Sequence, residues 1–536
     1  MQRARYDKRV ISLPDTFNAA TWFVDRNVAE GRGAKVAIEC GDERVSYGQL
    51  ADRVNRVGNL LRDRFDVRIE ERVVMLVLDG PEFFHTFFGA IKIGAVPIPT
   101  STLWKPQDYE YVLNDSRARV VVVSEALLPQ LQAIPRERLR YLQHIVTIAE
   151  LKAGMADASP DLDAEATSRD DPAFWLYSSG STGFPKGCVH LQHDMVVCTE
   201  LYAKGILGMD ADDRCFSVAK LFFAYGLGNA MYCPLGVGAT AILWPGPPAA
   251  ANVFAVIERH RPTLFFSVPT NYGMLLAHTR EGQDFDLSSI RYAVSAGEAL
   301  PPALFERFKQ RFGVEILDGI GSTEILHIFI SNRPGDIRPG SSGRLVAGYE
   351  ARIVDEEGRD VRPGDIGNLL IAGDSTCAGY WNKHEKTKAT IEGRWIRTGD
   401  KYYQDDEGYF WYAGRSDDML KVGGIWVSPV ELENTMIEHP AVHECGVGAR
   451  ADHDGLLKPF AFVVLRPGVP RTPELAAELQ QFVRSKLADY KRPRWVAFID
   501  ELPKTATGKL QRYKLRERAA QSESGDDSTH APAALM

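Results

Sequence analysis

Residues 173–187 read AFWLYSSGSTGFPKG, in which an apolar run is followed by a loop of hydroxyl side chains and glycines. The run 173–176 predicts a buried strand that delivers the loop. Glycines let backbone N–H groups approach an anion closely, hydroxyl groups add donors, and Lys186 supplies a positive charge. These properties indicate a polyphosphate site, although Pro185-Lys186-Gly187 stands where a Walker A loop has Gly-Lys-Ser/Thr. From composition alone, an ordinary turn rich in glycine and serine is the alternative.

Alternating helical and strand patterns precede this loop. Residues 47–65 place leucine and valine at helical spacing, and residues 72–78 (RVVMLVL) form a short β-branched run. Residues 83–93 are again helical in pattern, and residues 118–123 (ARVVVV) predict a second strand that is buried on both faces. Helices that alternate with buried strands predict an α/β fold with a mainly parallel sheet.

Three further patterns follow the loop or lie just before it. Residues 152–172 are polar, acidic and rich in small side chains, which indicates a surface connector. A helix is expected at 303–312, with Gly313 as its C-terminal cap and a strand at 314–317. Between 340 and 412, turns rich in glycine and proline separate short apolar runs, which predicts a β-rich subdomain.

The chain returns to α/β character after residue 416. Helices are expected near 429–438 and 474–488, and the last sixteen residues have the composition of a disordered tail. The predicted fold class is therefore α/β, with a large N-terminal domain of α/β and β subdomains at 1–416. A smaller C-terminal α+β domain is expected at 417–520, followed by the tail at 521–536.

Composition and charge exclude several classes of protein. The 536 residues are 45% hydrophobic and 25% charged, which are ordinary globular values that exclude wholesale disorder, collagen-like repeats and coiled coil. With 63 Lys and Arg against 71 Asp and Glu, the net charge is −8, which implies no general affinity for nucleic acid. A polyanionic ligand would therefore need a local cationic site.

Cysteine usage and the N-terminus predict a cytoplasmic protein. The seven cysteines include no CxxC pair, and an odd number in so long a chain fits free thiols in a reducing compartment. The first residues, MQRARYDKRVISLPDTF, are charged and lack the apolar segment of a secretory signal. The uncharged run 221–257 is the one argument for a membrane span, but glycines and prolines interrupt it repeatedly. A core helix, a turn and a buried strand are expected there, without membrane association.

The loop at 177–187 resembles the signature loop of the adenylate-forming superfamily, which comprises acyl-CoA synthetases, luciferases and peptide-synthetase adenylation domains. Four further segments stand in the order of that superfamily's motifs. They resemble its second nucleotide motif (GIGSTE, 319–324), its ribose motif (RTGD, 397–400), its hinge motif (GRSDDMLK, 414–421) and its catalytic-lysine motif (PKTATGK, 503–509). The resemblance runs from about residue 15 to about residue 518, and the chain is identified as a member on these motifs.

The resemblance implies a set of residues that bind ATP. Asp400 would accept hydrogen bonds from both ribose hydroxyl groups, and Arg415 would bind the nucleotide through its guanidinium group. Glu324 would bind Mg²⁺, a cation that favours oxygen ligands. The full set implied for ATP or AMP comprises Ser178, Ser179, Gly180, Ser181, Thr182, Gly183, Lys186, Gly297, Glu298, Ala299, Asp318, Gly319, Ile320, Gly321, Thr323, Asp400 and Arg415.

Two segments resemble benzoate–CoA ligases in particular, KLFFAYGLGN at 220–229 and DGIGSTEILHIF at 318–329. This resemblance places the acyl substrate among Phe223, Ala224, Tyr225, His327 and Ile328. Ile320 stands where many superfamily members have an aromatic residue, and benzoate–CoA ligases share this isoleucine. Taken alone among its apolar neighbours, His327 would also suit a hydrogen-bonded residue of the core.

The reaction implied by the resemblance is the ATP-dependent ligation of an aromatic carboxylic acid to coenzyme A through an acyl-adenylate, with release of AMP and pyrophosphate. Lys509 would stabilise charge while the adenylate forms. The smaller domain would then turn about Asp417, so that Lys421 and the Gly423-Gly424 turn face the site and admit coenzyme A. ATP, Mg²⁺, coenzyme A and the aromatic acid are thus the expected cofactors and partners. The expected protein is a monomer or homodimer of aromatic catabolism.

Other functions stay open from the sequence. A fatty acyl or other small-acid CoA ligase would differ only in the depth of its pocket. A peptide-synthetase-like activator of amino acids would need an acidic residue near 222–225 for the substrate ammonium group, and none is present. A non-enzymatic nucleotide-binding or membrane module is the alternative of a different class. No His/Cys cluster has zinc-ligand spacing, and no GxSxG nucleophile elbow is present.

Overall fold

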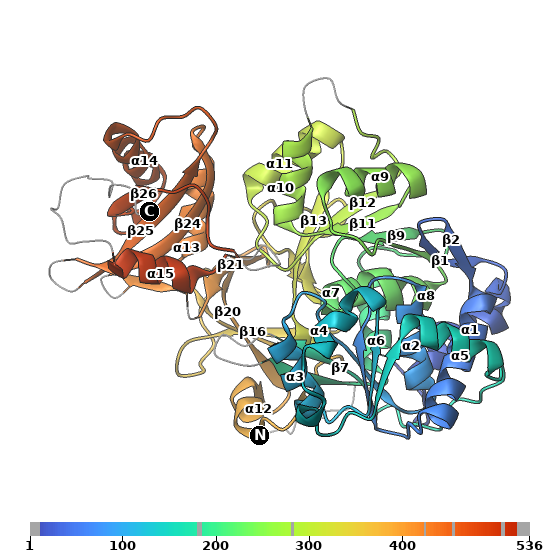
Figure 1. The fold of residues 1–536 in the computed structure, drawn as a ribbon. Coiled ribbons are helices and arrows are strands. Elements are labelled where there is room, and N and C mark those ends of the chain that lie inside the picture. Colours follow the sequence, from blue (N-terminus) through green and yellow to red (C-terminus); the bar gives the residue numbers. More distant parts are fainter. Residues whose placement is uncertain are drawn as a thin grey trace.

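A nine-stranded sheet runs through the N-terminal part of the molecule (Figure 1). The computed structural model describes residues 11–178, 185–279, 284–416, 418–422, 425–452, 456–504 and 510–521. The strands are β1 (Val36–Cys40), β2 (Glu43–Ser46), β9 (Arg214–Ser217), β10 (Thr240–Leu243), β11 (Leu264–Ser267), β12 (Tyr292–Ser295), β13 (Ile316–Gly321), β14 (Ile328–Ser331) and β15 (Arg344–Leu345). Their order is β15-β14-β13-β12-β11-β9-β10-β1-β2. All neighbours from β1 across to β13 pair in parallel, as expected of an α/β fold.

A second sheet, in the order β4-β3-β5-β6, is parallel throughout. Its elements are β3 (Arg72–Leu76), β4 (Val96–Pro99), β5 (Val120–Val123) and β6 (His144–Thr147), with helices α1 (Tyr47–Asn59), α2 (Pro81–Lys92), α3 (Pro106–Asp115), α4 (Leu128–Gln132) and α5 (Ile148–Asp157). The valines of β5 are all buried, which explains why this strand is apolar on both faces. Helix α1 begins at a capping box of Ser46 and Gln49, and it packs on α2 where Gly58 approaches Gly89.

The hairpin that carries the predicted phosphate loop forms a third sheet with β18 (Gly379–Tyr380). Strands β7 (Pro172–Ser178) and β8 (Lys186–Leu191) are antiparallel, with Ser178 opposite Lys186. The predicted strand before the loop is therefore present. Residues 179–184 lie outside the described part of the chain. Tyr380 pairs with Cys188, which brings distant parts of the sequence side by side.

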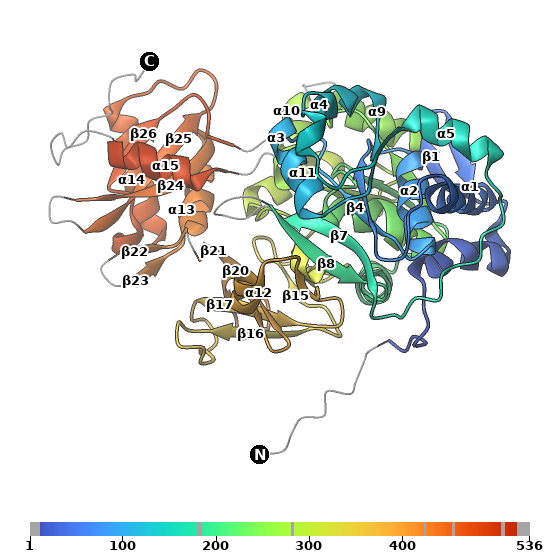
Figure 2. The ribbon, with the colours of Figure 1, turned by 60° about the horizontal axis from the view of Figure 1, so that its bottom comes forward.

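The β-rich subdomain predicted at 340–412 is confirmed. Its antiparallel sheet contains β16 (Glu350–Val354), β17 (Gly367–Ala372), β19 (Ile391–Glu392), β20 (Trp395–Gln404) and β21 (Phe410–Arg415). Helix α12 (His384–Thr390) contacts this sheet, and Figure 2 shows the subdomain at the lower edge of the larger body.

The C-terminal part forms a smaller α+β unit with its own hydrophobic core (Figure 1). Its strands are β22 (Leu420–Val422), β23 (Ile425–Val427), β24 (Val442–Ala451), β25 (Leu457–Leu465) and β26 (Trp495–Phe498), and its helices are α13 (Pro429–Ile437), α14 (Pro473–Lys486) and α15 (Arg512–Gln521). Helix α13 also contacts β21 and helix α11 (Pro302–Phe312) of the larger unit. The predicted fold class, a large α/β domain followed by a smaller one, is confirmed. The boundaries at 416–417 and 520–521 stay predictions.

The connector predicted at 152–172 is shorter than expected. Its first residues belong to helix α5, which continues to Asp157. Gly154 on this helix packs directly against Leu60. This tertiary contact stabilises the helix although its residues are of the types that are common in loops. The prediction was wrong for this part because small residues serve close helix packing as well as turns.

Two other elements end later than predicted. The strand expected at 314–317 is β13, which extends to Gly321 because its last residues pair with β14. Helix α15 includes Gln521, the first residue of the predicted tail, and residues 522–536 lie outside the described part. Long-range pairing and packing, which local patterns do not contain, extend both elements.

The uncharged run 221–257 folds into short helices and a buried strand, as predicted. It contains α7 (Ala224–Leu227), a π-helix at Gly228–Tyr232, α8 (Cys233–Val237), β10 and most of α9 (Ala250–His260). Among the described residues, no helix combines the length and the apolar character needed to cross a membrane. All seven cysteines are described, and all are free thiols, as predicted.

Candidate active site

The carboxyl ends of three neighbouring parallel strands lie at one edge of the large sheet. In its register, Ser267 of β11 lies opposite Ser295 of β12, and Ser295 lies opposite Asp318 of β13. Residues 297–299 follow β12 directly and lie at the same edge. Ligands of open parallel sheets bind outside the carboxyl ends of the strands. The fold therefore brings the predicted nucleotide residues 297–299, after β12, next to those that begin at Asp318 of β13.

Asp318 is buried at this edge, and burial raises the pKa of its carboxyl group well above the ordinary value. Its Oδ1 atom has no hydrogen-bond partner among the described residues. An unpartnered buried acceptor costs about 1–3 kcal/mol, so it indicates a polar ligand group or water at this position. At the next residue, Gly319, a Cβ atom would lie 2.8 Å from the Ile330 carbonyl oxygen, so only glycine fits.

Glu324, in the short helix Thr323–Ile325 after β13, is the centre of a second cluster that includes residues of the β7–β8–β18 sheet. The Tyr380 hydroxyl donates to Glu324 Oε1 at 2.7 Å, and the Ser178 hydroxyl donates to the same oxygen at 3.4 Å. The Lys186 ammonium group lies over the Tyr380 ring, 4.7 Å from its centroid. Ser178 and Lys186 come from the loop motif and Glu324 comes from the second nucleotide motif, and the structure makes them neighbours.

Lys186 is half-buried in this cluster. Burial lowers the pKa of its ammonium group, while the nearby Glu324 carboxylate acts in the opposite direction. A partly desolvated cation is stabilised by an added anion, which suits the predicted phosphate role. The other loop residues assigned to ATP, Ser179, Gly180, Ser181, Thr182 and Gly183, lie outside the described residues.

Asp400 and Arg415 face each other across β20 and β21. They are register partners, and Arg415 Nη1 donates to Asp400 Oδ1 at 2.9 Å. The same nitrogen lies 3.2 Å from the Thr398 carbonyl oxygen. The Asp400 side chain is largely buried, whereas that of Arg415 is half exposed. Because a guanidinium group has five N–H donors, donors of Arg415 stay available for a ligand.

Residues 223–225 form the start of helix α7 at the same edge of the sheet. The Tyr225 hydroxyl donates to the Val294 carbonyl oxygen of β12 at 3.1 Å. This hydrogen bond connects α7 to the strand that precedes the predicted nucleotide residues 297–299. Ile328 opens β14 and pairs with Gly321 of β13. The predicted acyl residues and the predicted nucleotide residues are therefore adjacent in the fold.

His327 is buried beside these residues, with 2% of its surface exposed. Its ring lies among those of Tyr202, Tyr225 and Tyr232, at centroid distances of 5.0, 6.2 and 6.1 Å. Burial lowers the pKa of His327 to about 3, so the ring is neutral at neutral pH. Neither ring nitrogen has a hydrogen-bond partner in the described part of the chain, contrary to the interpretation as a hydrogen-bonded core residue.

Sequence patterns did not identify several polar residues of the site. The Tyr232 hydroxyl lies near His327, and both this hydroxyl and the Asn229 side-chain amide are buried without hydrogen-bond partners among the described residues. Their spacing in the sequence is the same as that of ordinary core residues of a helix, so the spacing does not indicate that they belong to a site. Tyr380 was missed because nothing in its local sequence shows that its hydroxyl reaches Glu324.

The residues predicted to act from the C-terminal domain are largely undescribed. Lys509, Asp417, Gly423 and Gly424 lie outside the described residues. For Lys421, the structure gives only the main chain, which belongs to β22. The roles of these residues stay predictions.

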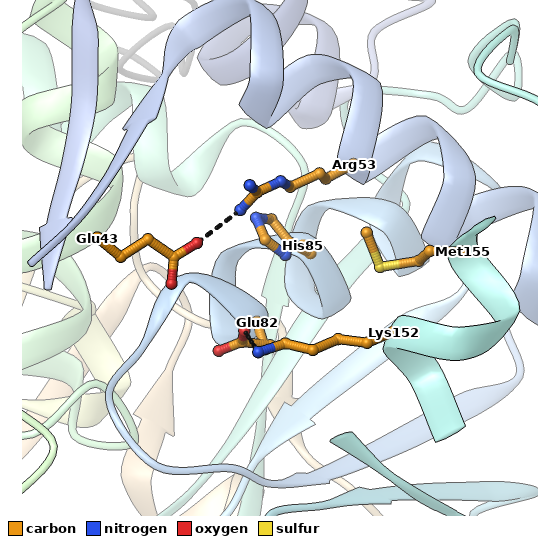
Figure 3. Close-up of a pocket in the computed structure, with 6 residues that line it drawn as sticks. All are labelled: Glu43, Arg53, Glu82, His85, Lys152 and Met155. Carbon is orange, nitrogen blue, oxygen red and sulfur yellow. Dashed lines mark hydrogen bonds and ion pairs between the residues drawn. The ribbon is translucent and has the colours of Figure 1, made fainter. Parts of the chain in front are cut away.

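A cavity of about 300 Å³ lies elsewhere, among β2, α1, α2 and α5 (Figure 3). Arg53 pairs with Glu43 at 2.9 Å and Lys152 pairs with Glu82 at 2.6 Å, so the charges that line it are matched. His85 lies between these pairs, and burial lowers its pKa to about 3. None of the predicted site residues lines this cavity, and its balanced charge does not suit a polyphosphate.

Comparison with protein families gives two matches that together span most of the chain. Residues 25–381 match the family described as AMP-binding enzyme. Residues 431–509 match the AMP-binding enzyme C-terminal domain.

Two relatives are similar over nearly their whole length. The chain is 50% identical to the benzoate–CoA ligase of Thauera aromatica, across 94% of this chain and 97% of the relative. It is 45% identical to the 4-hydroxybenzoate–CoA/benzoate–CoA ligase of Rhodopseudomonas palustris, across 94% of each chain.

Two solved structures share the fold over almost all residues. The anthranilate CoA ligase AuaEII in complex with anthranoyl-AMP matches with a TM-score of 0.90 and 46% identity, covering 95% of this chain and 98% of that one. The benzoate CoA ligase from Burkholderia xenovorans LB400 matches with a TM-score of 0.86 and 45% identity, covering 93% of this chain and 100% of that one.

Proposed function

The chain belongs to the AMP-binding enzyme family, and from this membership we propose how its site acts. It is an AMP-forming ligase that joins an aromatic carboxylic acid to coenzyme A through an acyl-adenylate, with release of AMP and pyrophosphate. The observation that carries the proposal is the meeting of Lys186 and Glu324 at Tyr380. Glu324 lies three residues before the buried His327 in the sequence.

The reaction has two half-reactions. In the first, the carboxylate of the acid attacks the α-phosphate of ATP, which forms the acyl-adenylate and releases pyrophosphate. Lys186 holds the phosphates, and Asp400 accepts hydrogen bonds from the ribose. Lys509 stabilises the negative charge that develops on the phosphate oxygens. In the second half-reaction, the thiol of coenzyme A attacks the acyl carbonyl carbon, and AMP leaves.

The Glu324 carboxylate suits Mg²⁺. Among the described residues, no three or more His, Cys, Asp or Glu side chains gather as a metal centre, so Glu324 would bind the ion with at most one other such side chain. Mg²⁺ in phosphate sites is held by one or two carboxylates together with substrate phosphates and water. When bound, the ion neutralises charge on the phosphate oxygens. The hydroxyls of Tyr380 and Ser178 both donate to Oε1 and so orient the carboxylate.

An aromatic acid suits the acyl site better than a fatty acid does. Rings of tyrosine surround His327, and ligand sites of this kind combine apolar walls with a few polar groups. The unpartnered His327 ring and the Tyr232 hydroxyl beside it can bind the carboxylate, a ring substituent or water. An aliphatic chain would leave these groups unpaired.

Formation of the thioester requires a change in the C-terminal domain. We infer from the family that this domain turns about Asp417, which removes Lys509 and brings Lys421 and the Gly423-Gly424 turn to the site. A cytoplasmic location and a monomeric or homodimeric state stay predictions.

A screen of pyrophosphate release tests the proposed function. The acids are benzoate, hydroxybenzoates, aminobenzoates, short fatty acids and amino acids, each with ATP and Mg²⁺. The expected result is acid-dependent release that is fastest with benzoate or a substituted benzoate. Fastest release with a fatty acid would reject the substrate class, and no release with any acid would reject the function.

Lys186→Ala is expected to raise the apparent KM for ATP about tenfold and to leave the fold intact. A hydrogen bond to a charged group is worth about 1.5–3 kcal/mol, and the ammonium group is half-buried where phosphate is expected. Initial rates of pyrophosphate release at varied ATP measure the change. Lys383→Ala is the matched control, because Lys383 pairs with Asp115 at 3.2 Å instead. A normal KM for ATP and a normal rate would show that Lys186 does not bind phosphate.

Ala224→Leu is expected to slow ring-substituted benzoates about tenfold more than benzoate. The added methine and two methyl groups overfill a packed site, which typically costs about 1–3 kcal/mol, and larger rings meet them first. Values of kcat/KM for benzoate and for hydroxybenzoates measure the change in preference. An unchanged substrate profile would remove Ala224 from the acyl site.

A further inference from the structure

One face of strand β8 lies along the segment that carries Glu324. Alternate residues of a strand share a face, so Lys186, Cys188 and His190 point the same way. Cys188 Sγ lies 3.8 Å from the Thr323 carbonyl oxygen, and His190 Nε2 lies 2.7 Å from that oxygen. The strand that supplies the predicted phosphate lysine therefore also contacts the backbone immediately before Glu324.

His190 forms a fully buried pair with Asp194, the first residue of helix α6 (Asp194–Cys198). His190 Nδ1 lies 2.7 Å from Asp194 Oδ2, and both side chains are 0% exposed. Both ring nitrogens thus face oxygen acceptors, the Asp194 carboxylate and the Thr323 carbonyl. The ring therefore bridges the Asp194 carboxylate and the Thr323 carbonyl, with one nitrogen at each.

The segment that His190 contacts is strained. Leu326, two residues after Glu324, has φ 73° and ψ −43°, which a non-glycine residue rarely adopts. Such a conformation persists only where the surrounding structure fixes it. Three successive carbonyl oxygens are fixed here, Thr323 O by His190 at 2.7 Å, Glu324 O by the Cys377 N–H at 2.8 Å and Ile325 O by the Ser375 hydroxyl at 2.9 Å.

We propose that His190 and Asp194 act as positioning residues for the metal-binding carboxylate, because their hold on the Thr323 carbonyl sets the direction of Glu324 toward Mg²⁺ and phosphate. The inference rests on the proposed function, since it takes Glu324 as the Mg²⁺ ligand. Glutamine at this position carries both of its N–H donors on a single nitrogen, so it could bind Asp194 or Thr323 but would not span the two as the ring does. The backbone before Glu324 would then shift, and the carboxylate would be held by Tyr380 and Ser178 alone, while the contacts of the ribose and acyl residues would stay.

The variant His190→Gln tests this proposal, with His260→Gln as the matched control. His260 forms another buried pair, Nδ1 to Glu39 Oε2 at 2.8 Å, at the opposite end of the sheet from β13. The Mg²⁺ concentration for half-maximal pyrophosphate release should rise about tenfold in His190→Gln and stay unchanged in His260→Gln. The KM for benzoate should stay unchanged in both.

A second measurement does not depend on turnover. Titration calorimetry gives the Kd of ATP with and without Mg²⁺ for the wild type and for each variant. In His190→Gln, the tightening of ATP binding by Mg²⁺ should fall about tenfold, while the Kd of metal-free ATP should stay unchanged. Thioester formation from pre-formed benzoyl-adenylate and coenzyme A, in metal-free buffer, should keep its wild-type rate.

Asp194→Asn keeps the size of the side chain and covers the case in which His190→Gln does not fold. It should shift the Mg²⁺ requirement in the same direction, and the double variant should add little to either single change. A wild-type Mg²⁺ requirement in the folded variants would overturn the proposal, as would an equal rise in His260→Gln. If the wild type releases no pyrophosphate with any acid, the proposed function has failed, and calorimetry alone decides this inference.

Discussion

Lys509→Ala is expected to slow formation of the acyl-adenylate about 10²–10³-fold, which corresponds to about 2.7–4 kcal/mol of transition-state stabilisation. The ammonium group of Lys509 would lie beside the carboxylate and the α-phosphate, where negative charge develops. Thioester formation from pre-formed benzoyl-adenylate should keep a near-wild-type rate, because the smaller domain has turned and Lys509 has left the site. Single-turnover measurements of pyrophosphate release and of thioester formation separate the two half-reactions.

Lys504→Ala is the matched control from the same segment. Lys504 Nζ pairs with Glu444 Oε1 at 2.7 Å, and both side chains are partly exposed. Its loss should cost at most about 1 kcal/mol of unfolding free energy and leave both half-reactions unchanged. Equal slowing of both half-reactions by Lys509→Ala would contradict the domain rotation. No slowing of adenylation would show that Lys509 is not the catalytic lysine.

The helix after Lys509 has anchors of its own, so the alanine variant should fold. Arg512 at the start of α15 binds both carboxylate oxygens of Glu433 on α13. Its Nε atom also lies 3.6 Å from Asp418 Oδ2. Glu433 in turn accepts the Val447 N–H of β24 at 2.7 Å. These buried contacts hold α15 to α13 and β24 without Lys509.

Gly228→Ala is expected to lower benzoate-dependent adenylation about 10²-fold. An alanine Cβ would lie 2.5 Å from His327 Nε2 and 2.7 Å from the Tyr232 hydroxyl oxygen, and Cβ atoms essentially never come closer than 3.0 Å to another atom. Tyrosine rings enclose His327, so the clash displaces the acyl site. A displacement of about 1 Å can cost about 10²-fold in rate. Measurements of kcat and KM for benzoate should show the loss, with the KM for ATP unchanged.

Gly273→Ala is the control for the glycine substitution. Gly273 lies in helix α10 (Pro269–His278), and an added Cβ would meet no atom within 4 Å. This variant should keep full activity and gain about 0.5–1 kcal/mol of stability, because alanine favours the helix. Gly228→Ala should lose about 1–3 kcal/mol through overpacking, so thermal unfolding must show that it is folded during the assay. A wild-type KM for benzoate would contradict the placement of His327 at the acyl site.

Local patterns predicted the fold class because buried parallel strands and amphipathic helices have distinct periodicities. The valines of 118–123 correspond to β5. The helix predicted at 47–65 corresponds to α1, which ends at Asn59, and to the π-helix Leu60–Arg64 that continues it. The run 173–176 predicted β7 in the same way. Where contacts from elsewhere decided an element, as for the part of α5 up to Asp157 and the end of β13 at Gly321, the local pattern failed.

For the candidate site, the sequence predicted the types of residue and their order along the chain. Ser178, Lys186 and Glu324 were assigned to phosphate and metal through motifs, and the chemistry of each side chain supports its assignment. The sequence did not show that Glu324 meets Ser178 and Lys186, because its motif is separated from theirs by more than a hundred residues.

The sequence by itself determined the family, the α/β class and the kinds of groups offered to ATP and to an aromatic acid. Only the tertiary structure decided which of these groups touch. The contact of Tyr380 with Glu324 depends on the pairing of β18 with β8, and that of His190 with Thr323 depends on where β8 lies against the end of β13. The physical reason is that strand order and register arise from packing between segments that are far apart in the sequence. Periodicity and motifs indicate only whether a segment is buried or exposed and which groups it offers, and not which other segment it meets.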